Sequence, residues 1–194
     1  MNLYDFDKTV YLKDCTVEFW KHCLRRKPYL IFGLPMQVLS CVIFKLKLKP
    51  REYFKEKFLF FVKHFKDIDA EIRLFWEKEE KNICAWFADT VKADDIIISA
   101  SPEFLVKPMA DKFGIRCIAS VVDEKSGRFL SKNCKGQEKI ARLAQIGVTE
   151  AEKAFSDSKS DLPMLSLAKE GCIIRNKNTK EYVITETITN TSEE

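Results

Sequence analysis

The chain has 194 residues, of which 46% are hydrophobic and 32% charged, with a formal net charge of +4. This composition predicts a soluble globular protein with one core domain and at most a modest insertion, and it excludes a largely disordered chain. The charge is too small to indicate a nucleic-acid partner, and no basic patch with interleaved aromatic residues is present. Seven scattered cysteines without a C-x-x-C pair, and no secretory signal peptide, predict reduced thiols in a cytoplasmic protein.

The predicted elements change character along the chain. Met1 to Tyr4 form a short strand that leads directly into Asp5-Phe6-Asp7. Residues from about 15 to 88 then have a helical, aromatic-rich pattern with almost no glycine. After Asp94, short apolar runs alternate with helical stretches. They predict strands at 96–98, 115–120, 153–156 and 172–175, helices at 101–112, 136–145 and 161–169, a hairpin or flap at 121–131 with Gly127 at its turn, and a polar, frayed tail after Thr185.

This alternation predicts an α/β fold, a Rossmann-like parallel sheet covered by helices on both faces, with a small α-helical cap inserted after the first strand. We assign residues 1–14 and 90–194 to the core and residues 15–89 to the cap. In open parallel sheets the active site lies at the carboxyl ends of the strands. Asp5, Ser99 and Asp157 each follow an apolar run, so we expect them at that edge.

A D-x-D pair directly follows the first strand. Spacing of two places Asp5 and Asp7 on one side of an extended backbone, where two carboxylates repel and need a cation, a shared proton or different roles. Mg²⁺ suits such a site, and Asp157 is the expected third ligand, supported by Asp161 from the next turn. Asp161 also fits a helix N-cap before Pro163, and the two roles are compatible. A second D-x-D at 67–69 follows no strand and is interpreted as solvated surface.

Phosphoryl transfer also needs hydrogen-bond donors and cations around the phosphate oxygens. Ser99 and the adjoining Ala100, at the end of the 96–98 strand, are the expected phosphate-binding residues. Ser101 is a rival, but the Ser-Pro-Glu order favours an N-cap role. A lysine is expected from the segment 133–139, where Lys135 and Lys139 are both candidates and either would by default be an exposed surface residue.

Taken together, these motifs resemble the haloacid dehalogenase superfamily over nearly the whole chain. The similarity rests on four segments in order: Asp5-Phe6-Asp7-Lys8-Thr9, Ile-Ile-Ser99, Lys135 or Lys139, and Ser156-Asp157-Ser158-x-x-Asp161. The insert resembles the helical cap of the subgroup that contains phosphoserine phosphatases. The resemblance implies a nucleophilic Asp5 that forms an aspartyl-phosphate, and an Asp7 that acts as general acid and then base.

The resemblance also implies Mg²⁺ held by Asp5, the main-chain carbonyl of Asp7, and Asp157. Dehalogenating members resemble this pattern less well because they lack the second aspartate. One residue departs from the pattern: Lys8 stands where glycine is usual, which places a cation beside the phosphate entrance. A Cys-x-Gly-x-x-Lys pattern favours Lys139 for the third motif, whereas a Lys-Gly step favours Lys135; we favour Lys139.

The cap is expected to select the substrate. Residues 29–44 are uncharged and flanked by basic residues, and this stretch is short for a membrane span of about 20 residues. We favour cap core packed under Phe54, Phe58, Phe61 and Phe65; the alternative is a surface that docks on anionic lipid, peripheral to the inner membrane face. Residues 24–28 and the stretch after them resemble the cap of bacterial phosphatidylglycerophosphate phosphatases, and Asp14 has a counterpart there.

The expected function is a Mg²⁺-dependent phosphomonoester hydrolase. Its substrate is a phosphorylated small molecule or a lipid headgroup such as phosphatidylglycerophosphate, with phosphoserine as the other named candidate. Arg25, Arg26 and Arg51 are candidates for binding an anionic substrate group, although solvated surface is the preferred interpretation of each. A phosphotransferase or phosphomutase uses the same intermediate and stays open. A non-catalytic membrane-associated binding module is disfavoured because Asp5, Asp7 and Asp157 are all present.

Overall fold

The structure is a computed structural model that describes residues 1–189. Its strands form one six-stranded sheet in the order β3-β2-β1-β4-β5-β6, parallel throughout except for β6, which is antiparallel to β5. The strands are β1 (Asn2–Tyr4), β2 (Ile96–Pro102), β3 (Arg116–Ser120), β4 (Ala151–Ser156), β5 (Ala168–Asn176) and β6 (Tyr182–Thr189). The predicted α/β class and mostly parallel sheet are confirmed.

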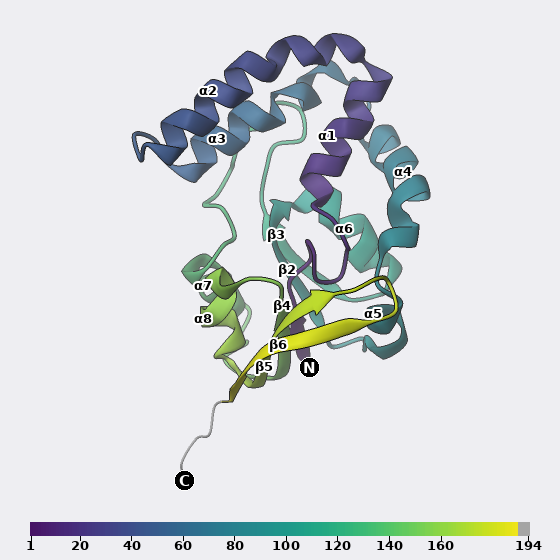
Figure 1. Ribbon diagram of the computed structural model, residues 1–194, viewed down its shortest axis with the longest axis vertical. Coiled ribbons are helices and arrows are strands. Elements are labelled where there is room, and N and C mark those ends of the chain that lie inside the picture. The colour runs from purple at the N-terminus through teal and green to yellow at the C-terminus, as the bar shows by residue number, and fades with distance from the viewer. Residues whose placement is uncertain (190–194) are drawn as a thin grey trace.

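Helices cover both faces of the sheet because successive residues of each strand point to opposite sides. Leu3 of β1 joins a core cluster with Leu143, Met164 and Leu165, from the helices α7 and α8. Tyr4 joins the opposite cluster, which contains residues of α1, α4, α5 and α6. Figure 1 shows α7 and α8 on the side of the sheet away from α5 and α6. The bounds are α1 (Cys15–Arg26), α4 (Ile68–Glu79), α5 (Ala85–Thr90), α6 (Glu103–Lys112), α7 (Gln137–Gln145) and α8 (Leu162–Leu165).

The segment between β1 and β2 is helical, as predicted. Besides α1, α4 and α5 it holds α2 (Leu34–Lys45), α3 (Arg51–Phe58) and the 3₁₀ turns η1 (Pro28–Gly33), η2 (Leu59–His64) and η3 (Glu80–Asn82). Figure 1 shows α2 and α3 side by side as a long hairpin at the top of the molecule, with α2 outermost. We call α2, α3 and their connection the roof hairpin.

The predicted hairpin at 121–131 is present and extends to the roof hairpin. Its strands are joined by an antiparallel bridge between Val122 and Phe129, and Gly127 has the left-handed φ of 75° that its turn needs. A Cβ at Gly127 would lie 2.6 Å from the carbonyl oxygen of Leu59, so only glycine allows this close approach. The Phe129 amide donates to Glu56 at 2.9 Å, and the Asn133 amide donates to Glu52 at 3.0 Å. We call residues 121–133 the flap.

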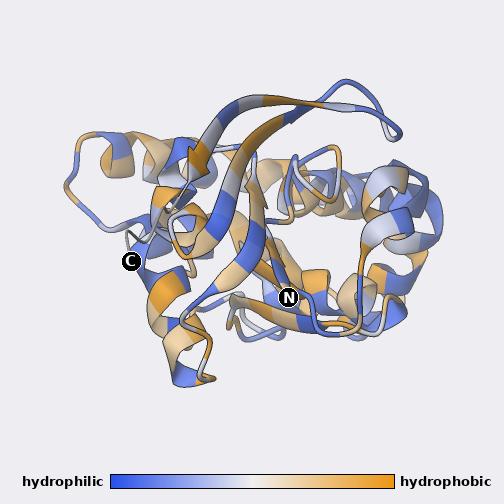
Figure 2. Cartoon of the chain, turned by 90° about the horizontal axis from the view of Figure 1, so that it is seen from below, coloured by the Kyte–Doolittle hydropathy of each residue, from blue (hydrophilic) through white to orange (hydrophobic). Residues whose placement is uncertain are grey.

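Two predictions at the C-terminal side are wrong. The expected helix at 161–169 is shorter: after the 3₁₀ turn η4 (Lys159–Asp161), α8 ends at Leu165 and the chain enters β5 at Ala168. Ala168 and Cys172 are fully buried in the sheet, where they pair with Ala151 and Phe155 of β4. This pairing makes residues 168–172 a strand and ends the helix early. The tail after Thr185 is not frayed as far as residue 189, because β-branched residues continue β6 along β5. Figure 2 shows both hydrophobic and hydrophilic segments along this β5–β6 ribbon. Residues 190–194 of the predicted tail lie outside the described part.

The roof hairpin corrects a third prediction. Residues 29–44 are not packed as cap core: Phe32 is 84% exposed, and Val38 and Leu39 are each 60% exposed. By contrast, the D-x-D at 67–69 is solvated surface as predicted, with Asp67 capping α4 through a 2.8 Å bond from the Ala70 amide.

Candidate active site

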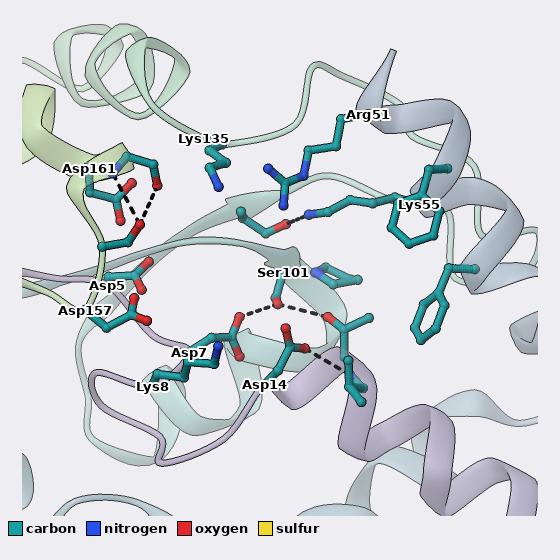
Figure 3. Close-up of a pocket in the computed structure, with 18 of the residues that line it drawn as sticks. Asp5, Asp7, Lys8, Asp14, Arg51, Lys55, Ser101, Lys135, Asp157 and Asp161 are labelled. Carbon is teal, nitrogen blue, oxygen red and sulfur yellow. Dashed lines mark hydrogen bonds between the residues drawn. The ribbon is translucent and has the colours of Figure 1, made fainter. Parts of the chain in front are cut away.

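A cavity of about 330 Å³ lies at the carboxyl ends of the central strands, beneath the roof hairpin. Figure 3 shows carboxylates at its base and cationic side chains pointing down from above. The carboxylates come from the ends of β1 and β4 and from the start of α1, and most of the cations come from α3 and from the segment before α7. The charged lining residues are Asp5, Asp7, Asp14, Asp157 and Asp161, with Lys8, Arg51, Lys55, Lys135 and Lys139.

Asp5 follows β1, and its amide bonds to the Phe155 carbonyl at 2.9 Å, which extends the sheet to the cavity edge. Its Oδ1 accepts a 2.6 Å hydrogen bond from Nζ of Lys139, on the first turn of α7. Lys139 is 1% exposed, and its Nζ also donates to Oδ2 of Asp161 at 2.8 Å. Burial by itself lowers the pKa of Lys139, but the two carboxylates outweigh it and raise that pKa. Burial raises the pKa of Asp5, although Lys139 opposes it.

The two candidate lysines therefore have different positions. Lys139 is buried and bonded to Asp5, whereas Lys135 is half-buried at the cavity wall. Asp161 stands at the N-cap position of α8, but its side chain makes no capping hydrogen bond. It accepts instead from Lys139 and, at 2.9 Å, from Oγ of Ser156. The geometry places Asp161 in the support of the Asp5–Lys139 pair.

Asp7 is held by two donors. Its Oδ1 accepts from the amide of Cys15 at 2.7 Å, at the start of α1, and its Oδ2 accepts from Oγ of Ser101 at 2.5 Å. Ser101 Oγ also lies 2.9 Å from Oγ1 of Thr16 (Figure 3). Burial, followed by the nearby Asp14 carboxylate, raises the pKa of Asp7 to about 6. A carboxyl oriented by two donors and with this raised pKa can both give and take a proton near neutral pH.

The three residues at the end of β2 differ from the predicted arrangement. Ser101 is not the N-cap of α6: Pro102 holds that position, without a side-chain capping bond. Ser101 points at Asp7 because β2 stays extended as far as Pro102. Ala100 lines the cavity, and its carbonyl oxygen accepts from Lys55. Ser99 is fully buried, does not line the cavity, and accepts a 3.1 Å bond from the Ser101 amide.

Lys8 and Asp157 lie on the open side of the site. Lys8 has a φ of 61°, in the left-handed region that glycine adopts most readily. Burial raises the pKa of Asp157, and the Lys8 ammonium lowers it in part. Asp14 caps α1 through a 3.0 Å bond from the Val17 amide and also lines the cavity.

The upper wall contains a cavity-lining face of α3 that sequence reasoning missed, although it had named Arg51 as a candidate for an anionic group. Arg51, Phe54, Lys55 and Phe58 all line the cavity, and their spacing of i, i+3, i+4 and i+7 marks one face of α3. That mixed cationic and aromatic face is a signal that the sequence contained. Lys55 donates at 2.7 Å to the Ala100 carbonyl and at 2.7 Å to Asn133 Oδ1. Burial, and then the charge of Arg51, lower the pKa of Lys55 to about 8.

Arg51 points into the cavity with Lys135, as Figure 3 shows, and is not solvated surface. Its buried Nε has no hydrogen-bond partner among the described residues. The other two arginines that were candidates for binding an anionic group lie away from the cavity. Arg26 pairs with Glu71, and Arg25 is exposed. A buried guanidinium nitrogen without a protein partner, on a side chain that lines the cavity, fits a role of Arg51 towards an anionic ligand.

The cavity base suits a divalent cation. Within residues 1–189 no group of three or more His, Cys, Asp or Glu side chains is arranged to hold a metal ion by itself. Mg²⁺ does not require one, because it binds through one or two carboxylates together with substrate phosphate and water. Asp5, Asp7 and Asp157 all line the cavity, and burial raises the pKa of each. This accumulation of buried negative charge fits a cation that would stabilise the ionised forms.

The sequence matches the haloacid dehalogenase-like hydrolase family over residues 3–166. The chain belongs to this family. No curated protein matches the chain. As a family member it is a hydrolase of the phosphohydrolase type, and its substrate is not determined.

Solved structures share the fold at low sequence identity. A protein of unknown function from Bordetella pertussis Tohama I has a TM-score of 0.67 and 18% identity, covering 84% of each chain. A phosphoserine phosphohydrolase-like protein from Francisella tularensis subsp. tularensis SCHU S4 has a TM-score of 0.56 and 15% identity, covering 88% of this chain and 84% of that one. A substrate-bound phosphoserine phosphatase has a TM-score of 0.54 and 15% identity, covering 88% and 83%. These similarities confirm the fold, including the helical cap after β1.

Proposed function

We propose that the chain is a Mg²⁺-dependent phosphomonoester hydrolase that acts through an aspartyl-phosphate on Asp5. The observation that carries the proposal is the bonding at the cavity base: Lys139 joins Asp5 to Asp161, while Asp7 is oriented separately by Ser101 and the Cys15 amide. Two carboxyl groups on one strand end thus have different partners and different roles. Mg²⁺, held by Asp5, the Asp7 carbonyl and Asp157, would neutralise charge on the transferring phosphoryl group.

In the first step Asp5 attacks phosphorus. Because Lys139 occupies Oδ1, we assign the attack to Oδ2. A bond forms between Oδ2 and phosphorus as the bond from phosphorus to the alkoxy oxygen breaks, and Asp7 protonates the departing oxygen. Lys139 also supplies positive charge beside the phosphoryl oxygens.

In the second step Asp7, now ionised, takes a proton from water. The hydroxyl oxygen bonds to phosphorus, the bond to Asp5 breaks, and inorganic phosphate leaves with Asp5 restored. Ser101 remains bonded to Asp7 Oδ2 through this exchange, and we assign it to positioning. Ala100 lines the cavity at the end of β2 and is the residue there that we assign to phosphate binding, whereas the buried Ser99 accepts the Ser101 amide and positions Ser101.

The upper wall supports a substrate with a second anionic group and an apolar part. Arg51, Lys55 and Lys135 provide cations, and the aromatic rings of Phe54, Phe58 and Phe129 line the same cavity. Such a wall favours a lipid phosphate such as phosphatidylglycerophosphate. Phosphoserine is the alternative, because a carboxylate would also satisfy the free Nε of Arg51.

The test is a screen of purified protein with Mg²⁺ against an aryl phosphate, phosphoserine, sugar phosphates and micellar phosphatidylglycerophosphate. Asp5→Asn is the inactive variant, and Asp69→Asn, an exposed aspartate of the other D-x-D, is the matched control. We expect metal-dependent phosphate release that is lost in Asp5→Asn and retained in Asp69→Asn. Addition of an acceptor alcohol separates hydrolysis from phosphotransfer, because a phosphotransferase would yield the phosphorylated alcohol. No turnover by the wild type on any ester would contradict the proposal and favour a binding module.

A further inference from the structure

Helix α2 has its polar side chains inside and its apolar side chains outside. Gln37 is 4% exposed and Ser40 2%, and both face the body of the protein. The side-chain amide of Gln37 donates to the main-chain carbonyl of Phe58 at 3.1 Å, across the contact with α3. Within α2, Ser40 Oγ donates to the main-chain carbonyl of Gln37 at 2.8 Å. In a water-facing helix the pattern is the reverse. Gln37 therefore fastens α2 to α3, Ser40 is buried on the same side with its hydroxyl satisfied within α2, and the apolar side of the helix is left for another surface.

The exposed apolar side is continuous with both ends of the helix. Nine large apolar residues of η1, of α2 and of the turn into α3 are more than a third exposed. These residues are Tyr29, Ile31, Phe32, Met36, Val38, Leu39, Val42, Leu46 and Leu48. We call this set the outer apolar face. Exposed apolar patches of this extent on a soluble protein mark a binding surface.

The charge around the outer apolar face indicates what covers it. No aspartate or glutamate occurs between Glu18 and Glu52. That interval contains eight basic residues, Lys21, Arg25, Arg26, Lys27, Lys45, Lys47, Lys49 and Arg51. Arg25 lies before the face, and Lys45, Lys47 and Lys49 lie exposed at its other end, where they alternate with Leu46 and Leu48. An apolar strip bounded at both ends by cations matches the boundary between the acyl chains and anionic headgroups of a bilayer.

The segment is suited to lie on a bilayer rather than to cross one. In the described part of the chain, Pro28–Lys45 is long and apolar enough for a span by length and composition, with 18 residues, a mean hydropathy of 1.4 and 17% of it buried. However, η1 is a 3₁₀ turn and α2 has only 12 residues. A helix of that length reaches about 18 Å, less than the roughly 30 Å of a hydrocarbon core. The bond from Gln37 to the Phe58 carbonyl and the burial of Ser40 also hold its inner side in the protein.

We propose that the outer apolar face docks this protein peripherally on an anionic phospholipid bilayer, with the apolar side chains in the interface and the lysines of the 45–49 turn at the headgroups. The observations that carry the proposal are the inverted helix α2, its continuous exposed apolar side and its basic borders. It goes beyond the proposed reaction and does not depend on it. The helix α3 that lines the catalytic cavity packs directly beneath α2 (Figure 1), so docking brings the roof of the cavity to the membrane.

The test is flotation of the purified full chain with vesicles of phosphatidylcholine alone or mixed with phosphatidylglycerol. We expect binding to the mixed vesicles that weakens at high salt, because screening lengths fall from about 10 Å at 0.1 M to about 3 Å at 1 M. Phe32→Ser/Val38→Ser/Leu39→Ser should weaken vesicle binding at least tenfold. Lys45→Gln/Lys47→Gln/Lys49→Gln should weaken it roughly a hundredfold, since each lysine near an anionic surface contributes about fivefold.

The matched control is Ile146→Ser/Val183→Ser/Ile184→Ser, which removes three exposed apolar side chains outside the roof hairpin and should bind like the wild type. Circular dichroism verifies that each variant is folded. Equal vesicle binding by the control and by Phe32→Ser/Val38→Ser/Leu39→Ser would overturn the proposal. The proposal would also be overturned if the wild type did not bind anionic vesicles. Sedimentation would then show whether the protein is monomeric or self-associates through α2. Vesicle binding that persists in both high salt and alkaline carbonate would contradict peripheral docking and indicate insertion into the bilayer. Phosphate release is measured separately, so failure of docking leaves the proposed reaction untouched.

Discussion

The base and the roof of the cavity are built in different ways. At the base, Asp5, Lys139 and Asp161 form a buried hydrogen-bonded set attached to β1, α7 and the loop after β4. At the roof, α3 presents Arg51 and Lys55 from a hairpin whose other helix exposes apolar side chains to solvent. The base is fixed by the sheet that forms the protein core. The roof is fixed mainly by helix-to-helix contacts and a few polar bonds, so it can vary without loss of the fold.

The largest expected effect is at the base. Lys139→Met leaves two buried carboxylates without their cation, and breaking a buried ion pair from one side costs about 3–5 kcal/mol. We therefore expect a large fall in the free energy of unfolding, measured in urea, together with loss of phosphate release. Lys135→Met, half-exposed at the cavity wall, is the control and should alter mainly KM. Equal losses of unfolding free energy in the two variants would contradict the different roles assigned to Lys139 and Lys135.

Ser101→Ala tests the orientation of Asp7. Removal of the 2.5 Å donor should lower kcat by about tenfold to a hundredfold, the size of effect seen when a positioning bond is lost, with little change in KM. Because that bond favours the ionised carboxyl, its loss should raise the pKa of Asp7 and shift the basic limb of the kcat profile, where Asp7 loses the proton that it gives to the leaving group, to higher pH. Ser101→Thr, which retains a hydroxyl, should recover part of kcat. An unchanged pH profile would mean that Ser101 serves packing alone.

Lys55 tests the roof. Its pKa of about 8 means that it is charged below that pH and becomes neutral as the pH rises through it. We expect KM for an anionic substrate to rise above about pH 8, while Lys55→Met should have a KM raised about tenfold and independent of pH in this range. Lys57→Met, on the same helix but outside the cavity lining, should follow the wild-type profile. A wild-type KM that stays constant from pH 7 to 9 would contradict this assignment.

The smallest expected effect concerns a left-handed backbone conformation that occurs once at the base and once at the roof. Lys8 at the base and Lys47 in the turn of the roof hairpin have left-handed φ values of 61° and 59°. A left-handed residue with a side chain costs roughly 1–2 kcal/mol, so Lys8→Gly and Lys47→Gly should each raise the free energy of unfolding by up to about 1 kcal/mol after the greater flexibility of unfolded glycine is subtracted. Urea unfolding measures both. Destabilisation in either variant would show that the lysine side chain contributes more than its backbone costs.

The base was largely predictable from sequence, because strand ends that carry Asp5 and Asp157 must meet at one edge of a parallel sheet. The preference for Lys139 over Lys135 rested on the Cys-x-Gly-x-x-Lys pattern, and the structure shows that Lys139 contacts Asp5. Ser101 was assigned to capping from its Ser-Pro-Glu order, and β2, predicted at 96–98, ends four residues later than expected. The exposed side of α2 was predicted to be core, since apolar composition indicates burial but does not identify the burying surface. Likewise, the polar appearance of residues 186–189 concealed β6, which is paired only through the tertiary contact with β5.

The bonds between the flap and α3 have a consequence for substrate exchange. Glu56 and Glu52 accept the amides of Phe129 and Asn133, and Lys55 bonds to both Ala100 and Asn133. The roof hairpin therefore cannot lift away from the sheet without breaking a bond: if it carries the flap with it, the Lys55–Ala100 bond breaks, and if it moves alone, all four bonds break. The latch in either motion includes the Lys55 ammonium, whose pKa is lowered to about 8. Turnover limited by product release would then report on the opening of this latch rather than on the cleavage of the phosphate ester.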